Sequence, residues 1–145
     1  MKFLKNGVYL ESDYPYQAAR SSCRISNIDP VFSLDSRQQV VEWYSGTKAD
    51  LYKALRQGPL SLAIGASDDF MYYSTGVFEG ACVSLNHAVD GFGFGHDEAT
   101  GLDYILVRNS WGTGWGEQGY AKMVALDVKN GKCDLYKHPS YPVIA

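Results

Sequence analysis

Two blocks of sequence decide the fold: residues 86–95 read NHAVDGFGFG, and residues 103–120 read DYILVRNSWGTGWGEQGY. At the start of the second block, side chains alternate in the period-2 pattern of a half-buried strand. The blocks predict strands over Ala88–Phe94 and Asp103–Asn109, joined by a loop over His96–Gly101, and another strand over Gly119–Leu126. Consecutive strands with a short connection pair side by side, so we expect an antiparallel sheet.

The chain before these blocks predicts one helix and two more strands. A capping-box pattern over Thr47–Asp50 precedes an apolar stripe with helical spacing, and Gly58-Pro59 ends the helix. Strands are expected over Gln39–Tyr44 and Leu60–Gly65. The small residues of the second either leave room on one face for another backbone or a ligand, or allow tight packing of the sheet on a helix, and the pattern alone does not choose. Residues 8–38 carry turn signals and no sustained period. The predicted fold class is therefore α+β.

Composition excludes several classes of function. The chain has 145 residues, with 13 Lys and Arg against 16 Asp and Glu, which gives a net charge of −3. This balance provides no basic surface for nucleic acid or an anionic membrane. No apolar run approaches the roughly 20 residues of a membrane helix, and the first residues lack the apolar stretch of a signal peptide. We therefore expect no nucleic-acid or membrane partner.

The residues indicate no cofactor or metal. Gly91–Gly95 lacks the spacing and the following helix of a dinucleotide-binding loop. The three histidines, His87, His96 and His138, show no i, i+4 pair, and no Gly-x-Ser-x-Gly elbow is present. The cysteines stand at positions 23, 82 and 133 without a C-x-x-C spacing. Composition alone leaves open whether they form one disulfide and one thiol or three free thiols.

One group of side chains remains that could catalyse a reaction. His87 precedes one predicted strand and Asn109 ends the next, so neighbouring antiparallel strands can bring them together. An imidazole that acts as a general base needs one ring nitrogen free for the nucleophile and the other held by an acceptor, which a carboxamide oxygen can supply. Trp111 could cover this hydrogen bond and exclude water. On spacing alone, a strand-end histidine, a turn asparagine and packing aromatics remain the commoner explanation.

A resemblance to a known family favours the catalytic explanation of these residues over the structural one. The sequence resembles the papain-family cysteine peptidases (papain and the cathepsins) over nearly its whole length, and its asparagine block is the most specific match. The resemblance implies a papain-like fold, of which 39–138 would be the β-rich right-hand lobe with the histidine and asparagine. Residues 1–38 would be an irregular remnant of the helical left-hand lobe, and 139–145 a C-terminal tail. The matching segments are Glu11–Tyr16, Gly58–Ile64, Asn86–Val89, Gly93–Gly95, Leu106–Tyr120 and Ser140–Pro142.

The resemblance also implies roles for single residues. His87 would be the catalytic base and ion-pair partner of a thiolate, with Asn109 as its orienting residue. Trp111 would shield that pair, and Trp115 would line the cleft on the leaving-group side. The pocket for the residue two before the scissile bond would be formed by Ala63, Leu85, Ala88 and His138. The family often has a small or acidic residue at the position of His138, which leaves the pocket preference open. Asp90, where the family usually has an apolar strand residue, is another departure.

The resemblance further implies that part of the reaction machinery lies outside this sequence. The family's nucleophile belongs to a Cys-Gly-[Ser/Ala]-Cys-[Trp/Tyr] motif about 130–150 residues before the histidine and asparagine, and this sequence has no such motif. Phe3–Gly7 also resembles the last turn of a helix that begins upstream. By family position, Cys82 and Cys133 would form a disulfide and Cys23 would pair with the missing segment. We therefore expect this chain alone to be inactive and to expose an apolar face.

Two functional hypotheses follow. In the first, the chain is the C-terminal portion of a cysteine endopeptidase whose parent is lysosomal or secreted. Its partners would be a peptide or protein substrate, the missing N-terminal segment, and a propeptide or a cystatin-type inhibitor. In the second, the chain is a non-catalytic module that binds peptides or a partner. The presence of His87, Asn109 and Trp111 favours the first.

Overall fold

The structure is a computed structural model that describes residues 7–33, 40–42 and 46–143. The chain divides into two compact units, one of residues 1–40 with 142–145 and one of residues 41–141. In the first unit, a 3₁₀ turn, η1 (Ile25–Asn27), and an isolated antiparallel bridge between Val8 and Phe32 are the described regular features. The identity of residues 1–38 as a lobe remnant stays a prediction.

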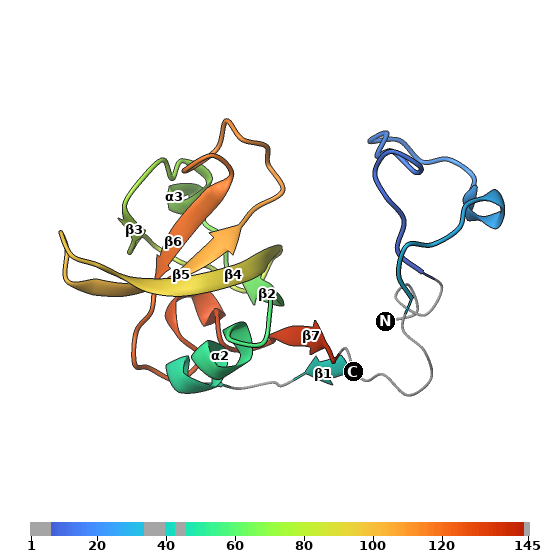
Figure 1. Ribbon diagram of the computed structural model, residues 1–145. Coiled ribbons are helices and arrows are strands. Elements are labelled where there is room, and N and C mark those ends of the chain that lie inside the picture. The colour runs from blue at the N-terminus through green and yellow to red at the C-terminus, as the bar shows by residue number, and fades with distance from the viewer. Residues whose placement is uncertain (1–6, 34–39, 43–45, 144–145) are drawn as a thin grey trace. The chain divides into compact units, whose positions relative to one another are not determined.

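The second unit is organised on a sheet with the strand order β1-β7-β2-β4-β5-β6-β3. The β4–β5–β6 pairs are antiparallel and β3 runs parallel to β6, and β4 and β5 form the long hairpin seen in Figure 1. The strands are β1 (Val40–Glu42), β2 (Leu60–Ile64), β3 (Val77–Phe78), β4 (His87–Asp97), β5 (Leu102–Arg108), β6 (Tyr120–Val124) and β7 (Ser140–Pro142). The helical elements of this unit are α2 (Lys48–Leu55), α3 (Asp68–Met71) and the 3₁₀ turn η2 (Lys132–Asp134).

The predicted helix forms where the capping box places it. In α2 the Thr47 side chain accepts from the Asp50 amide, and the Asp50 carboxylate accepts from the Thr47 amide. These bonds satisfy amides that a helix start otherwise leaves unpaired. The apolar stripe of α2 is buried, and it packs on a core shared with β2, β4, β5 and β6. The most deeply buried core side chains include Leu51, Ile64, Ile105, Val107, Met123 and Tyr136.

Sheet boundaries differ from the prediction mainly at the β4–β5 hairpin. The predicted loop over His96–Gly101 is confirmed for the turn at 98–101 and wrong at His96 and Asp97, because β4 continues through Asp97. His96 pairs with Asp103 across the strands, and their side chains hydrogen-bond, so polar residues extend the ladder instead of ending it. The predicted strand over Gly119–Leu126 is shorter in the structure, and the described part of the one over Gln39–Tyr44, residues 40–42, is a strand. The predicted helical turn over Phe3–Gly7 lies mostly outside the described residues.

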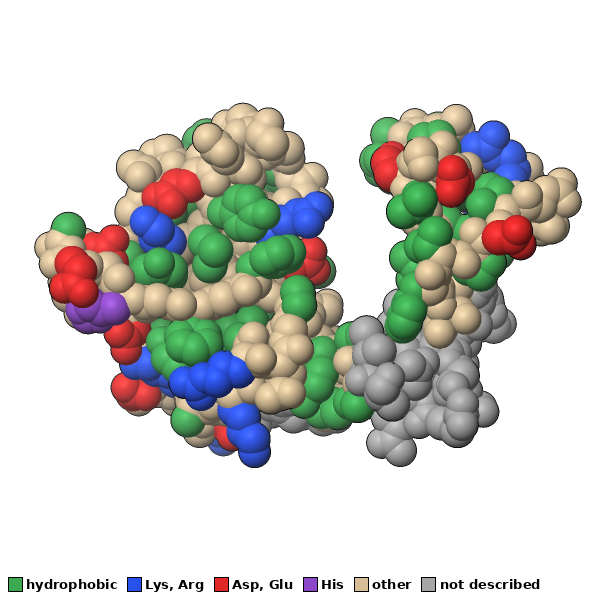
Figure 2. Space-filling view, viewed as in Figure 1, with side chains coloured by type: hydrophobic (Ala, Val, Ile, Leu, Met, Phe, Trp, Pro, Cys, Tyr) green, Lys and Arg blue, Asp and Glu red, His purple; other side chains and the backbone are tan. Residues whose placement is uncertain are grey.

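The outer face of β4–β6 is apolar and exposed. Phe92 lies in a register shift of β4, is 42 % exposed, and meets Tyr120 edge to face while Arg108 lies over its ring. Figure 2 shows hydrophobic side chains gathered on this face, with basic side chains beside them. Antiparallel sheets commonly pack one face on the core and leave the other in contact with solvent.

Candidate active site

The ends of two neighbouring strands bring the predicted base and its orienting residue together. His87 is the first residue of β4 and Asn109 directly follows β5, where its amide donates to the Gly119 carbonyl. His87 Nε2 and Asn109 Oδ1 lie 2.9 Å apart. The sequence prediction that these side chains meet is therefore confirmed.

A second hydrogen bond fixes the direction of the first. The backbone amide of Ser110 donates to Asn109 Oδ1 over 2.8 Å. An amide N–H can only donate, so the carboxamide atom that faces both partners is the oxygen, and His87 Nε2 must carry the proton. In the neutral imidazole this leaves the Nδ1 lone pair free. The carboxamide thus selects the tautomer that a general base requires.

Aromatic side chains enclose the histidine. Trp111 stacks on the His87 ring with 4.8 Å between centroids, and Trp115 meets Trp111 edge to face at 5.3 Å. Phe70 of α3 belongs to no sequence motif, yet it is 1 % exposed, and its ring centroid lies 5.9 Å from that of Trp111 and 6.4 Å from that of His87. Its only sequence signal is its place in a short capped helix. Together these rings hold the imidazole in an apolar surrounding on this side.

Hydrogen bonds also fix the loops that carry these residues. Asn86 binds Ala66 twice, through its side-chain oxygen and nitrogen, each over 2.9 Å, and so anchors the turn before His87 to the end of β2. Glu117 accepts from Thr75 and from the Gly76 amide. Burial opposes ionisation of Glu117, but these hydrogen bonds and Lys122 outweigh it, so the pKa of this carboxyl lies below its ordinary value. The Trp111–Trp115 loop is thereby tied to the residues after α3.

The disulfide lies beside this region. Cys82 and Cys133 are bonded, as the family resemblance implied, and Cys23 is a free, exposed cysteine in the first unit. Gly65 at the end of β2 donates to the Cys133 carbonyl, and a Cβ at Gly65 would collide with the Val83 carbonyl. The expected room for another backbone beside the small residues of this strand is therefore confirmed at Gly65.

The predicted pocket residues are only partly brought together. Ala63 and Ala88 are direct cross-strand partners of β2 and β4. Leu85 lies in the turn before His87, and His138 precedes β7, which pairs with β2 through Ser61 and Ser140. Both side chains are half-buried. A common pocket formed by these four residues stays a prediction.

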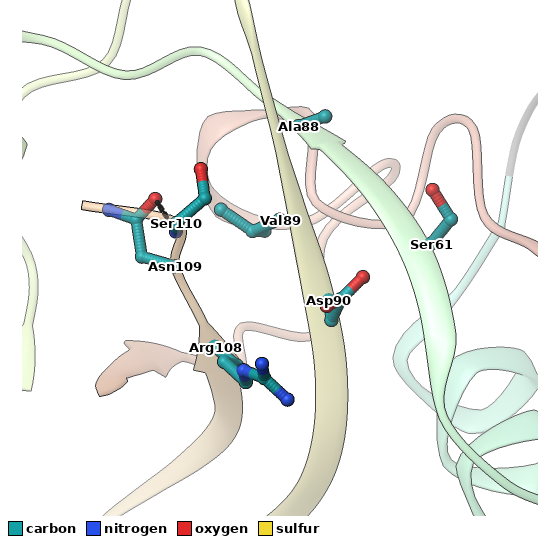
Figure 3. Close-up of a pocket in the computed structure, with 7 residues that line it drawn as sticks. All are labelled: Ser61, Ala88, Val89, Asp90, Arg108, Asn109 and Ser110. Carbon is teal, nitrogen blue, oxygen red and sulfur yellow. Dashed lines mark hydrogen bonds between the residues drawn. The ribbon is translucent and has the colours of Figure 1, made fainter. Parts of the chain in front are cut away.

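A pocket of about 190 Å³ adjoins the asparagine. Its walls come from the starts and ends of β2, β4 and β5, and Figure 3 shows the polar side chains around it. Asn109 Nδ2 is buried and has no hydrogen-bond partner among the described residues. The pocket is lined by Ser61, Ala88, Val89, Asp90, Arg108, Asn109 and Ser110.

The described residues contain neither a cluster of metal-binding side chains nor a helix that could span a membrane. Within them, no three His, Cys, Asp or Glu side chains lie close enough together to hold a metal ion. No helix in the described ranges combines the length and apolarity needed to cross a bilayer.

Comparison with known proteins identifies the family. Residues 1–143 match the family model described as papain family cysteine protease, so the chain belongs to this family. It is 42 % identical over 145 residues to a probable cysteine protease, RD21B, of Arabidopsis thaliana, and 41 % identical over 143 residues to vignain of Phaseolus vulgaris. The matches cover 97 % and 96 % of this chain but only 30 % and 38 % of those relatives.

Solved structures agree with this assignment. The bromelain protease from Ananas comosus, in complex with the E64 inhibitor, superposes with a TM-score of 0.91 at 32 % identity, over 99 % of this chain and 67 % of that one. Digestive procathepsin L 3 of Tenebrio molitor gives a TM-score of 0.85 at 35 % identity, over 99 % and 46 %. The predicted papain-like fold, represented mainly by its β-rich lobe, is therefore confirmed.

Proposed function

We propose that this chain supplies the base and the orienting residue of a peptide-hydrolysing site that works by a Cys-His-Asn mechanism. The observation that carries the proposal is the pair of hydrogen bonds on Asn109 Oδ1, from His87 and from the Ser110 amide. They leave His87 Nδ1 as the nitrogen that can take a proton from a thiol.

In this mechanism His87 acts twice. Its Nδ1 first takes the proton of the nucleophilic thiol, and the resulting thiolate attacks the scissile carbonyl carbon. The imidazolium then returns the proton to the leaving amine and becomes neutral again. The neutral imidazole later takes a proton from the water that releases the acyl group, and this proton passes to the departing thiolate. Asn109 keeps the ring oriented throughout without adding a charge. Trp111, stacked on the ring, limits the access of water to that hydrogen bond.

The thiol is proposed to come from a segment outside this sequence. Cys82 and Cys133 are bonded to each other, and neither they nor Cys23 stands in the family's nucleophile motif. The exposed apolar face of β4–β6 supports a site that further protein completes, as does Asn109 Nδ2, which is buried and has no hydrogen-bond partner among the described residues. Because water is a much poorer nucleophile than a thiolate, the chain alone is expected to be inactive.

The finer assignments follow the same proposal. Ala63, Leu85, Ala88 and His138 form the pocket for the residue two before the scissile bond, and Trp115 lies on the leaving-group side. The expected substrate is an internal peptide bond of a peptide or protein. A propeptide or a cystatin-type inhibitor would occupy the same cleft. The disulfide supports a parent protein in an oxidising compartment, lysosomal or secreted.

The test compares the isolated chain with a fusion of this chain behind the upstream portion of vignain. A fluorogenic dipeptidyl substrate at mildly acidic pH should be cleaved by the fusion and not by the chain alone. In the fusion, His87→Ala should lower kcat/KM by about 10²–10⁴-fold, while His96→Gln, outside the site, should leave it unchanged. Equal turnover by the isolated chain and the fusion would contradict the missing-nucleophile proposal.

The second candidate, a non-catalytic module, is favoured by the absence of the nucleophile motif from the sequence. It predicts that the isolated chain binds a fluorescently labelled peptide with unchanged affinity after His87→Ala. The peptidase proposal predicts that tight peptide binding requires the upstream segment. Fluorescence anisotropy on the isolated chain and on the fusion separates the two.

A further inference from the structure

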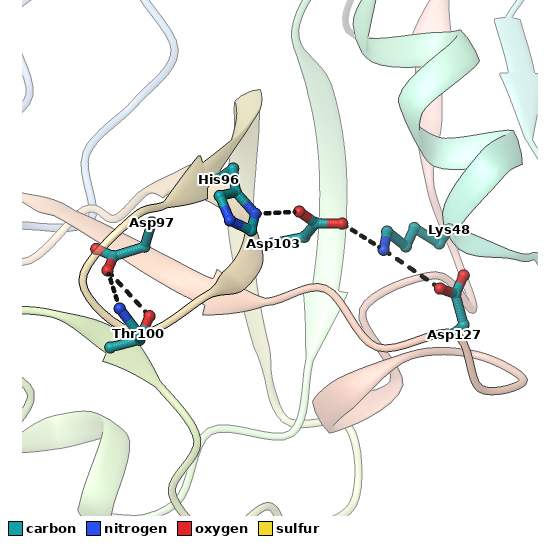
Figure 4. A network of polar contacts seen from close by, with 6 residues as sticks. All are labelled: Lys48, His96, Asp97, Thr100, Asp103 and Asp127. Atoms are coloured by element: carbon teal, nitrogen blue, oxygen red, sulfur yellow. Dashed lines mark hydrogen bonds and ion pairs between the residues drawn. The ribbon is translucent and has the colours of Figure 1, made fainter.

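A network of charged side chains lies at the far end of β4, away from His87 at its start (Figure 4). His96 Nδ1 lies 2.8 Å from one oxygen of the Asp103 carboxylate, and Lys48 Nζ lies 2.6 Å from the other. Lys48 also reaches Asp127 at 3.3 Å. Asp103 therefore sits between two groups that can both be positively charged.

This network joins three parts of the second unit. His96 and Asp103 face each other on the two strands of the β4–β5 hairpin. Lys48 belongs to the first turn of α2, and Asp127 lies in the segment after β6. The Ala125 amide, from that same segment, donates to the Asp103 carbonyl over 2.8 Å. Side chain and backbone of Asp103 thus hold the hairpin, the helix and the segment after β6 together.

Acidic groups dominate the charges around His96. Asp97 and Glu98, from its own strand and the following turn, act on it through space, as does Asp103 from β5. Asp97 itself accepts from the amide and the hydroxyl of Thr100, so it stays at the hairpin turn. Lys48 of α2 is the cation of this group, and Asp103 lies between it and the imidazole.

We propose that His96, Asp103, Lys48 and Asp127 form a proton-responsive clasp that fastens the tip of the β4–β5 hairpin to α2 and the segment after β6. When His96 is protonated, its N–H⁺ donates a charge-assisted hydrogen bond to Asp103. When His96 is neutral, that bond loses its ionic part and Lys48 is the only positive charge that contacts Asp103 within the described residues. The clasp is independent of the proposed peptidase activity.

The direction of the pH dependence follows from the shifts of the two groups. The hydrogen bond to Asp103 raises the pKa of His96 above its ordinary value, with the nearby acids adding to the effect. A raised histidine pKa contributes stability that is present below the unfolded-state pKa of about 6.5 and is lost as the pH rises through the folded value.

The pKa of Asp103 sets the acidic limit of the pH range in which the clasp is complete. The hydrogen bonds from Lys48, and then from His96, lower the pKa of Asp103. Its contribution is therefore present above the unfolded-state pKa of about 4 and is lost as the pH falls through the folded value. The clasp is complete between these limits, in mildly acidic solution.

The first test is a double-mutant cycle on the full chain with His96→Gln and Asp103→Asn. Amide hydrogen exchange at the hairpin tip reports local opening, corrected for the intrinsic pH dependence of exchange. At about pH 5.5 the two changes should be coupled, by about two- to fivefold in the opening constant, and at about pH 8 the coupling should fall towards one. The matched control, Asp68→Asn on the distant helix α3, should not couple with His96 at either pH. Equal coupling at the two pH values would overturn the proposal.

The second test needs no variant. In an NMR titration of the wild-type chain, the ring signals of His96 and the amide signals of Asp103 and Asp127 should move with one common midpoint. Amide signals of Asp103 and Asp127 that stay constant while His96 titrates would also overturn the clasp.

Discussion

The two units of this chain differ most in what their apolar residues touch. In the second unit, Leu51, Ile105 and Met123 have no exposed surface. In the first unit, none of the described residues 7–33 is buried, and Leu10 and Val31 are more than half exposed. The difference shows that apolar content alone does not make a core, because burial requires elements that pack against each other.

The residues of the candidate active site all belong to the second unit. His87, Asn109 and Trp111 stand on strands and loops whose backbone is fixed by the sheet and by the disulfide region of the second unit. The paired strands β4 and β5 place the two side chains within a hydrogen bond of 2.9 Å. We infer that the base and its orienting residue are assembled before any nucleophile segment is present.

The largest expected contrast is in hydrogen exchange. Amides of β4, β5 and β6 should exchange through opening of the core, whereas amides in 7–33 are shielded by few hydrogen bonds and no buried surface. The protection factors should differ by about 10³-fold or more. Hydrogen exchange read by mass spectrometry gives both regions in one experiment, and equal protection would contradict the comparison.

The next largest difference between the units is expected in the unfolding free energy lost when an apolar side chain is shortened. Ile105→Ala removes a fully buried side chain and should lower the free energy of unfolding by about 2–5 kcal/mol. Val31→Ala in the first unit should change it by less than about 0.5 kcal/mol. Urea denaturation followed by tryptophan fluorescence measures both. A large loss from the Val31 change would mean that the first unit has a core of its own.

Substitution of the cysteines should give a slightly smaller difference in unfolding free energy between the two units. Replacing both Cys82 and Cys133 by serine opens a loop of 51 residues and should cost about 2–4 kcal/mol of unfolding free energy. The matched change Cys23→Ser, at an exposed free thiol, should be nearly neutral. Chemical denaturation under non-reducing conditions tests this, and an unchanged midpoint for the double variant would refute it.

The smallest contrast is at a helix cap. Thr47→Ala removes the hydroxyl that accepts from Asp50 and should cost about 1 kcal/mol. Ser12→Ala, which removes an exposed hydroxyl of the first unit that donates to Asp13, should cost less than about 0.5 kcal/mol. Equal midpoints for the two variants in urea would remove the cap as a source of stability.

Local patterns predicted much of the second unit. The capping box and apolar stripe of α2, the strand β2 and the β4–β5 pairing follow from period and turn chemistry. β3 and β7 were missed, because two- or three-residue strands depend on distant partners and carry no period of their own. His96 and Asp97 were assigned to a loop because their polarity conceals a cross-strand hydrogen bond that only pairing reveals.

The sequence also predicts the two central residues of the candidate site, but not all of the contacts that support them. His87 and Asn109 follow from the motif and from the adjacency of antiparallel strand ends. The double hydrogen bond of Asn86 and the position of Phe70 depend on how β2 and α3 fold back toward β4, which no local pattern encodes. The bond from the Ser110 amide, which fixes the carboxamide, involves the neighbouring residue and could have been anticipated as an Asx-type contact.

The tautomer of His87 is the most direct test of a pre-assembled site. Nitrogen-15 NMR of the imidazole in the isolated chain, at a pH where the ring is neutral, reports which ring nitrogen carries the proton. A pre-assembled pair predicts the proton on Nε2 in the wild-type chain and a loss of that preference in Asn109→Ala. A proton on Nδ1, or the same mixture of tautomers in both proteins, would contradict it.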